Sequence, residues 1–218
     1  KLKIRTKLFL SLSITSTIGC YAVYFYCVAP FQTLQINATL AASALLILTC
    51  FKLSRRKPSS SCLNSFRTNS GTFSSECSQA VPFRGKHCRI CKKCVVKYDH
   101  HCVWIDSCIG QHNHKMFLLT VFLYLVNIFG GSYISLLFHC DWDIGLIPNC
   151  SLAYATDSSA LVFVCCCYVL IIGVALMILL MQQIVLVSFN ITSYEWRQMP
   201  REASFWSSLV TSPYDKGL

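Results

Sequence analysis

Nine cysteine and histidine side chains crowd a short central stretch of this 218-residue chain: Cys77, His87, Cys88, Cys91, Cys94, His100, His101, Cys102 and Cys108. They lie among lysines and arginines, with few aliphatic residues to build a core. This pattern is typical of a small domain that folds around zinc and not of a disulfide scaffold. Each tetrahedral zinc takes four such ligands, so nine groups would serve two ions and leave a surplus. The spacing alone fits a purely structural zinc module equally well.

The surplus lies in the run Asp99-His100-His101-Cys102. A free cysteine has a pKa of about 8.5 and is mostly thiol at neutral pH, so a nucleophilic cysteine needs a base or a positive charge beside it. We predict that Cys102 is the nucleophile, that His100 is its base and that Asp99 orients the imidazole, as in a Cys-His-carboxylate triad. Local order in the sequence does not by itself prove that geometry.

The elements that must position this stretch are apolar. The chain is 54% hydrophobic and only 13% charged, with a mean hydropathy of +0.51, which is typical of a membrane protein. Four segments are long enough to span a bilayer: residues 8–31, 34–53, 116–138 and 159–189. We therefore predict an all-α polytopic membrane protein with four transmembrane helices and a zinc-binding cysteine-rich domain between helices 2 and 3.

Basic residues set the predicted orientation. All nineteen Lys and Arg lie before the first span, between Lys52 at the end of the second span and the start of the third, or after the fourth. The positive-inside rule then places both termini and the cysteine-rich loop in the cytosol, a reducing compartment. The net charge of +10 favours an acidic partner, and anionic lipid of the bilayer is the simplest one. A nucleic acid is not expected, because topology explains the charge and only Trp104 offers a stacking platform.

The predicted domains follow from these patterns. Residues 1–53 hold helices 1 and 2, residues 54–76 form a flexible cytosolic linker, and residues 77–115 form the cysteine-rich domain. Residues 116–189 hold helices 3 and 4, and residues 190–218 begin a cytosolic C-terminal segment. In the predicted lumenal loop, Cys140 and Cys150 either form a disulfide or stay free, and Asn149 is a formal glycosylation sequon. Because the chain begins at Lys1, we expect a piece of a longer protein.

Together with Trp104, Cys108-Ile109-Gly110, Asn113 and Phe117, the Asp-His-His-Cys run gives a close resemblance to a known family. The chain resembles the DHHC-family protein S-acyltransferases, which are membrane-embedded palmitoyltransferases. The segment Thr192-Ser193-Tyr194-Glu195 is similar to that family's Thr-Thr-x-Glu motif. The resemblance implies transfer of a palmitoyl or similar long-chain acyl group from acyl-CoA to protein cysteines, through an S-acyl-enzyme on Cys102.

The resemblance also implies two zinc sites. The first is formed by Cys88, Cys91, His101 and Cys108. The second is formed by Cys77, His87, Cys94 and a fourth position that is Ser74 here, so that a water, Cys62 or Glu76 would have to complete it. Val103 and Ser107 stand where the family has Pro and Asn, and the Asp-Pro-Gly motif after the second span is absent. These departures indicate a divergent member.

Further roles are implied for residues around the trio. Arg84 and Lys86 match basic positions that meet the phosphates of CoA, and the alternative is that both are solvated residues facing anionic lipid. Trp104 is placed to contact the acyl chain. The Ser193 hydroxyl is expected to bond Asp99, with ordinary helix capping as the alternative. The implied protein substrates carry cytosolic cysteines near an endomembrane or plasma membrane.

One alternative function remains open from the sequence. A catalytically silent membrane scaffold would use the zinc module for protein contacts only, and Ser74 and Val103 favour it. The two functions differ in one observable, because a scaffold binds zinc without forming an acyl-enzyme.

Overall fold

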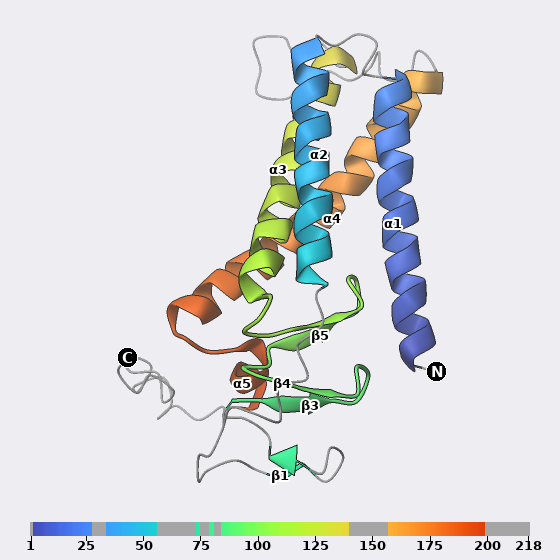
Figure 1. Cartoon of the computed structure of the whole chain (residues 1–218). Helices are drawn as coiled ribbons and strands as arrows, with labels where there is room; N and C mark the ends of the chain where they lie inside the picture. The colour runs from blue at the N-terminus through green and yellow to red at the C-terminus, as the bar shows by residue number, and fades with distance from the viewer. Residues whose placement is uncertain are drawn as a thin grey trace. The chain divides into compact units, whose positions relative to one another are not determined.

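The computed structural model of the chain describes residues 2–27, 34–55, 73–74, 79–80, 84–139 and 157–198. Four long helices dominate it: α1 (Leu2–Cys27), α2 (Leu34–Ser54), α3 (His114–His139) and α4 (Asp157–Ser188). A short helix, α5 (Ser193–Gln198), follows α4 (Figure 1). The mostly helical architecture agrees with the sequence prediction. Cys140, Asn149, Cys150, Cys62, Glu76 and Cys77 lie outside the described residues.

The cysteine-rich stretch is built from two-stranded antiparallel sheets. β1 (Phe73–Ser74) pairs with β2 (Gln79–Ala80), β3 (Lys86–Cys88) with β4 (Lys93–Val95), and β5 (His100–Cys102) with β6 (Ser107–Ile109). Strands of two or three residues bury too little apolar surface to be stable alone. Hairpins this short therefore need additional interactions to stabilise them.

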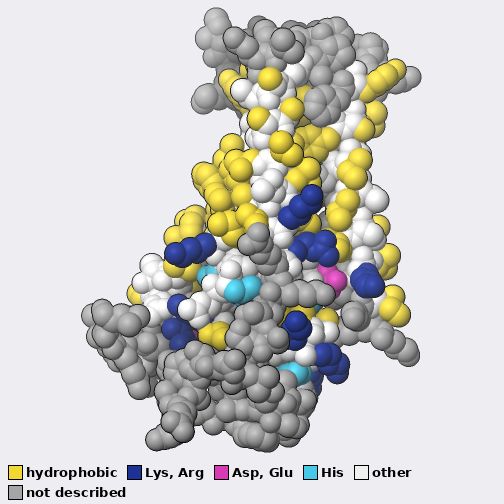
Figure 2. Space-filling model, viewed as in Figure 1, with side chains coloured by type: hydrophobic (Ala, Val, Ile, Leu, Met, Phe, Trp, Pro, Cys, Tyr) yellow, Lys and Arg dark blue, Asp and Glu magenta, His cyan; other side chains and the backbone are white. Residues whose placement is uncertain are grey.

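The chain divides into two compact units. The cysteine-rich unit comprises Lys1–Leu10, Phe51–Leu118 and Leu180–Leu218, and the helical unit comprises Ser11–Cys50 and Leu119–Leu179. The helical unit contains no Lys or Arg in its sequence. In Figure 2 the side chains over the helices are largely hydrophobic, whereas Lys and Arg gather over the cysteine-rich unit.

Three helices among the described residues are long and apolar enough to cross a membrane, over Asn37–Ser54, His114–Leu137 and Ala160–Ser188. Large hydrophobic side chains such as Leu45, Val164 and Ile171 are exposed along two of them. A soluble protein would bury such a surface, whereas a bilayer solvates it. The chain therefore has the character of an integral membrane protein.

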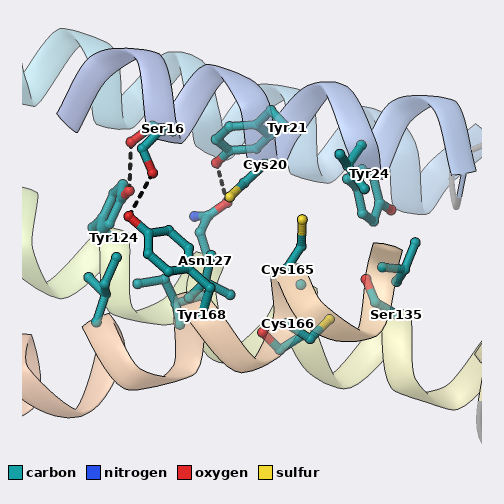
Figure 3. A pocket seen from close by; sticks show the side chains of 18 of the residues that line it. Ser16, Cys20, Tyr21, Tyr24, Tyr124, Asn127, Ser135, Cys165, Cys166 and Tyr168 are labelled. Atoms are coloured by element: carbon teal, nitrogen blue, oxygen red, sulfur yellow. Dashed lines mark hydrogen bonds between the residues drawn. The ribbon is translucent and has the colours of Figure 1, made fainter. Parts of the chain in front are cut away.

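Inside the helical unit, α1 is tied to the other helices by side-chain hydrogen bonds. Ser16 bonds the Tyr168 hydroxyl on α4 at 2.9 Å, and Thr17 bonds the Tyr124 hydroxyl on α3 at 2.9 Å. The Tyr21 hydroxyl donates to Asn127 Oδ1 on α3, which also accepts from Ser43 on α2. All of these residues except Ser43 line a pocket among the four helices (Figure 3). Cys166 packs in a core cluster with Cys27 and Val162, as expected for small apolar packing residues.

Asn113 fixes the start of α3 within the cysteine-rich unit. Its buried side chain donates to the carbonyls of Ser54, at the end of α2, and Cys108, on β6, and accepts from the backbone N–H of Gly110. Gly110 sits against β4, where an added Cβ would meet Val95 Cγ1 at 2.6 Å and the Val96 carbonyl oxygen at 2.9 Å. Only glycine allows the two hairpins to approach this closely.

Candidate active site

Four ligand side chains from the two larger hairpins meet in one cluster. Cys88 and Cys91 come from the first hairpin, and His101 and Cys108 from the second, and their ligand atoms all lie within 4.8 Å of one another. His101 Nδ1 lies 3.8 Å from Cys88 Sγ, 3.4 Å from Cys91 Sγ and 3.6 Å from Cys108 Sγ. This set is the one expected from the resemblance.

The donor set fits zinc. Zn–S bonds of about 2.3 Å at tetrahedral angles require ligand atoms about 3.8 Å apart, close to the distances above. Three thiols and one imidazole are soft ligands of the kind that structural zinc prefers. Since the four ligands come from both hairpins, a bound zinc would join β3–β4 to β5–β6.

A second pair of predicted ligands also lies together. Cys94 Sγ is 3.7 Å from His87 Nδ1, and the two residues face each other in the β3–β4 register. Cys77, the third predicted ligand, is not among the described residues, and the side chain of Ser74 is not described either. The described residues therefore bring together two of the three predicted protein ligands of this site.

The predicted nucleophile and its partners lie around β5. Cys102 ends the strand and is buried, and its thiol lies close enough to His100 to raise the pKa of that imidazole. His100 Nδ1 bonds Asp99 Oδ2 at 2.6 Å, which leaves Nε2 as the ring nitrogen available to Cys102. The other face of the imidazole packs edge-on against Phe117. Asp99, His100 and Cys102 therefore lie together at this strand, and their catalytic roles stay predictions.

Electrostatics couple the carboxylate to the imidazole. Burial alone would raise the pKa of Asp99, but hydrogen bonds from His100 and the Ser193 backbone outweigh it and lower the pKa to about 2. Burial alone would lower the pKa of His100, but hydrogen bonds with Asp99 and Cys102 outweigh it and raise the pKa to about 9. With this pKa, the His100 imidazole is mainly protonated at neutral pH.

Asp99 is 1% exposed and is held from its far side by the segment after α4. Its Oδ1 accepts the Ser193 backbone N–H at 2.6 Å, and its Oδ2 accepts the Ser193 hydroxyl at 3.0 Å and Gln183 Nε2 at 3.2 Å. With His100, four donors satisfy the two carboxylate oxygens. This network leaves the carboxylate little freedom to turn away from the imidazole.

Arg84 and Glu195 lock α5 onto the first hairpin. Arg84 Nε and Nη2 each lie 2.6 Å from one Glu195 oxygen, and Nη2 also donates to the Asn190 carbonyl at 2.7 Å. Both side chains are 8% exposed. Glu195 in turn accepts the backbone N–H of Thr192. A buried, bidentate pair of this kind positions the whole segment that holds Asp99.

Lys86 and Trp104, the other residues predicted to meet acyl-CoA, lie near the surface. Lys86 Nζ sits 3.8 Å above the ring of Tyr194 on α5. Trp104 is 53% exposed and packs edge-on against Phe9 of α1, with ring centroids 5.7 Å apart. Contacts of Arg84, Lys86 and Trp104 with acyl-CoA stay predictions.

Comparison with known proteins agrees with this geometry. The family model described as DHHC palmitoyltransferase matches residues 67–199, which include both hairpins, α3, α4 and the Ser193 segment. The chain belongs to the DHHC palmitoyltransferase family. The family residues Asp99, His100, His101 and Cys102 are all present.

Curated DHHC relatives are similar over part of their length. Palmitoyltransferase ZDHHC23-B of Danio rerio is 39% identical over 65% of this chain and 35% of its own length. Palmitoyltransferase ZDHHC23 of Homo sapiens is 36% identical over 66% of this chain and 36% of its own. Palmitoyltransferase AKR1 of Mortierella alpina is 44% identical over 29% of this chain and 11% of its own. The chain thus spans about a third of the ZDHHC23 relatives.

Two residues of this DHHC site were not assigned a role from the sequence. These residues are Gln183, near the end of an apolar segment, and His114, at the start of α3. In the structure, His114 Nε2 lies 3.0 Å from Gln183 Oε1, and the Gln183 amide nitrogen in turn donates to Asp99. The available signal was a polar amide inside an otherwise apolar span, which usually has a partner.

Proposed function

We infer that this chain is a protein S-acyltransferase that moves a long-chain acyl group from acyl-CoA to protein cysteines through an S-acyl-enzyme on Cys102. One observation carries this proposal: a buried thiol, Cys102, lies beside an imidazole that is bonded to a buried carboxylate at 2.6 Å. A purely structural zinc module does not require this arrangement of thiol, imidazole and carboxylate. The family match supports the same conclusion.

In the first half-reaction, the Cys102 thiolate attacks the carbonyl carbon of the acyl-CoA thioester. A bond forms between Cys102 Sγ and the acyl carbon, and the bond from that carbon to the CoA sulfur breaks. The cationic His100 gives its proton to the departing CoA thiolate, so the products are S-acyl Cys102, free CoA and neutral His100.

In the second half-reaction, the neutral His100 removes the proton from a substrate cysteine. The resulting thiolate attacks the acyl carbon on Cys102, and Cys102 leaves as a thiolate beside the restored imidazolium. Each step exchanges one thioester for another, so no ATP is needed. Asp99 stays ionised throughout and keeps the imidazole oriented.

The zinc cluster has a supporting role in this proposal. Zinc bound by Cys88, Cys91, His101 and Cys108 would supply structural cross-linking only, since all four coordination positions are taken by protein. His101 and Cys102 are adjacent on β5, so that cross-link would hold the nucleophile in register. We further propose that His87, Cys94 and Cys77 form the second zinc site, with a fourth ligand that Ser74 does not supply.

The proposed topology has four spans, with α1 as the first, and a cytosolic cysteine-rich unit. Support comes from the positive charges, because every Lys and Arg of the chain belongs to the cysteine-rich unit. This topology brings Cys102 to the cytosolic surface, where acyl-CoA and the cysteines of membrane-proximal proteins are found. Burial of an acyl chain in hydrocarbon yields about 0.8 kcal/mol per CH₂, which favours a substrate partitioned into the membrane.

The deciding experiment is labelling of the purified protein in detergent with alkyne palmitoyl-CoA. We expect a label that neutral hydroxylamine releases and that is lost in Cys102→Ser. The matched control is Cys167→Ser, which removes an exposed cysteine of α4 and should leave the label unchanged. If folded, zinc-loaded protein takes no label, or takes it equally without Cys102, the scaffold function replaces the enzyme.

A further inference from the structure

Gln183 lies near the end of α4, five residues before the helix terminus at Ser188. It is 4% exposed, although its neighbours Gln182 and Ile184 are exposed. A buried amide in an apolar helix is costly unless all of its hydrogen-bonding groups are satisfied. Here the partners are unusual, because they belong to the proposed catalytic network.

The amide of Gln183 is satisfied at both ends. Its two Nε2 hydrogens reach Ser193 Oγ at 2.8 Å and Asp99 Oδ2 at 3.2 Å, and its Oε1 faces His114 Nε2 at 3.0 Å. A carboxylate can only accept, so the nitrogen must face Asp99 and the oxygen must face His114. His114 consequently carries its proton on Nε2, and this bond fixes which way the amide points.

Ser193 depends on Gln183 for its own direction. The Ser193 hydroxyl has one proton, and it donates that proton to Asp99 Oδ2 while it accepts from Gln183. The donor from Gln183 therefore disfavours any rotamer in which the hydroxyl turns from Asp99. Two of the three side-chain donors on Asp99 are thus set by one glutamine.

The neutrality of the amide is also important. A lysine or arginine in this place would neutralise Asp99 and compete with His100 for its charge. A glutamate would set a second carboxylate against it. A glutamine donates two hydrogen bonds and leaves the negative charge of Asp99 directed at the imidazole.

We propose that Gln183 is a positioning residue for acyl transfer, which sets Asp99 and Ser193 so that the His100 ring faces Cys102. The proposal rests on the acyltransferase function and adds a residue of α4 to the machinery. Gln183 itself touches no reacting atom. Its effect should appear in the rate of acyl-enzyme formation at saturating palmitoyl-CoA and not in the concentration that half-saturates it.

The test compares Gln183→Met and Gln183→Glu with the matched controls Gln182→Met and Gln182→Glu. In Gln183→Met, the loss of the donors should reduce the saturated rate about tenfold, the effect of roughly one net hydrogen bond. In Gln183→Glu, of nearly the same shape, the reduction should be larger, about a hundredfold, because a carboxylate faces Asp99. The half-saturating palmitoyl-CoA concentration should stay within about twofold, and both Gln182 variants should match wild type.

The energetic coupling between Gln183 and Ser193 gives a second measurement. If Gln183 acts through Ser193, the double variant Gln183→Met/Ser193→Ala should be only slightly slower than the slower single variant, whereas independent roles would multiply the two losses. A milder variant, His114→Phe, frees the amide without changing α4. We expect about a threefold loss of saturated rate from it, and it tests the proposal even if Gln183→Met does not fold.

The outcomes distinguish failure of the positioning role of Gln183 from failure of the acyltransferase function on which it rests. If wild type takes no Cys102-dependent label, the acyltransferase function fails. If wild type is labelled and Gln183→Met and Gln183→Glu react at the wild-type rate, only the positioning role fails. The role also fails if folded Gln183 variants change the half-saturating concentration alone, or if His114→Phe has no effect.

Discussion

The hairpins β3–β4 and β5–β6 have the same backbone arrangement but carry different side chains. A shift of fourteen residues superposes their sequences: His87 corresponds to His101, Cys88 to Cys102, and Cys94 to Cys108. The registers agree, since His87 pairs with Cys94 and His101 pairs with Cys108. Even the turns match, because Lys92 and Asp106 both have positive φ, 56° and 47°.

The two hairpins differ in the residues around the cysteine that ends the first strand, Cys88 in one and Cys102 in the other. Cys88 is followed three residues later by Cys91, whose backbone N–H points at Cys88 Sγ from 3.5 Å. Cys102 is followed at the same distance by Ile105, which is buried. The second hairpin also carries Asp99 and His100 where the first has Gly85 and Lys86. Each hairpin supplies two ligands of the cluster. We name β3–β4 the metal-binding hairpin for its Cys-x-x-Cys pair, and β5–β6 the catalytic hairpin for the proposed role of its acid–base pair.

The largest expected effect comes from the metal-binding hairpin. Cys91→Ser removes one of four zinc ligands, and structural zinc contributes on the order of 10 kcal/mol to folding. We expect loss of one zinc per chain, of the cooperative thermal transition and of the acyl-enzyme together. Metal analysis and thermal unfolding measure this, and retention of the acyl-enzyme in zinc-depleted Cys91→Ser would break the division of roles between the hairpins.

The catalytic hairpin should respond in the opposite manner. His100→Gln keeps every ligand of the cluster but removes the base, so zinc content should stay at the wild-type value. The rate of acyl-enzyme formation should fall by about 10²–10⁴. Zinc content and acyl label measured in parallel distinguish a catalytic role of His100 from a structural one. A drop in zinc would mean that His100 is structural.

The charge pair of the catalytic hairpin should also be visible as pH-dependent stability. The pKa of His100 is raised from 6.5 to about 9, so its contribution is fully present below about pH 6.5 and is lost as pH rises through 9. The shift corresponds to a few kcal/mol at most, roughly 3. Thermal unfolding of wild type and His100→Gln at pH 6.5 and 9.5 measures it.

The difference in unfolding temperature between these two proteins should shrink at the higher pH. Other groups that titrate in this range cancel, because they are common to both proteins. A difference that is constant or grows with pH would show that His100 is not held as a cation.

The smallest expected effect comes from making the hairpins more alike. Ile105→Cys restores the Cys-x-x-Cys spacing after Cys102 and gives the nucleophile a neighbouring soft ligand. With zinc in excess, we expect extra zinc on the protein and about a tenfold slower acyl-enzyme formation, the effect of a modest competing site. Ile105→Val is the matched control and should react like wild type. If Ile105→Cys binds no extra zinc, the missing thiol is not what keeps Cys102 free.

Several features were accessible from the sequence because they depend on local spacing or composition. The Cys88, Cys91, His101 and Cys108 set follows from ligand chemistry and family resemblance, and the apolar segments follow from length and hydropathy. The fourteen-residue repeat is also present in the sequence, as two His-Cys pairs each followed six residues later by a cysteine and an aliphatic residue, but it was not recognised there. It is too short to indicate a solenoid, and it emerges only when strand register is known.

Other features lay beyond sequence reasoning. The structure pairs the Arg84 guanidinium with Glu195, 111 residues away. Gln183 was only a polar residue near a helix end, yet it contacts Asp99 across 84 residues. Such partners depend on how the end of α4 and α5 pack against the hairpins, which no local pattern encodes.

The sequence by itself determined the reactive groups and the elements that hold them, since thiol chemistry, metal-ligand spacing and hydrophobic length are properties of residues and their near neighbours. Only the tertiary structure decided which groups support Asp99, because a buried carboxylate takes whichever donors the packed chain brings within about 3 Å. Ser193 and Gln183 came to Asp99 because α4 and α5 are held against the hairpin, in part by the Arg84–Glu195 pair.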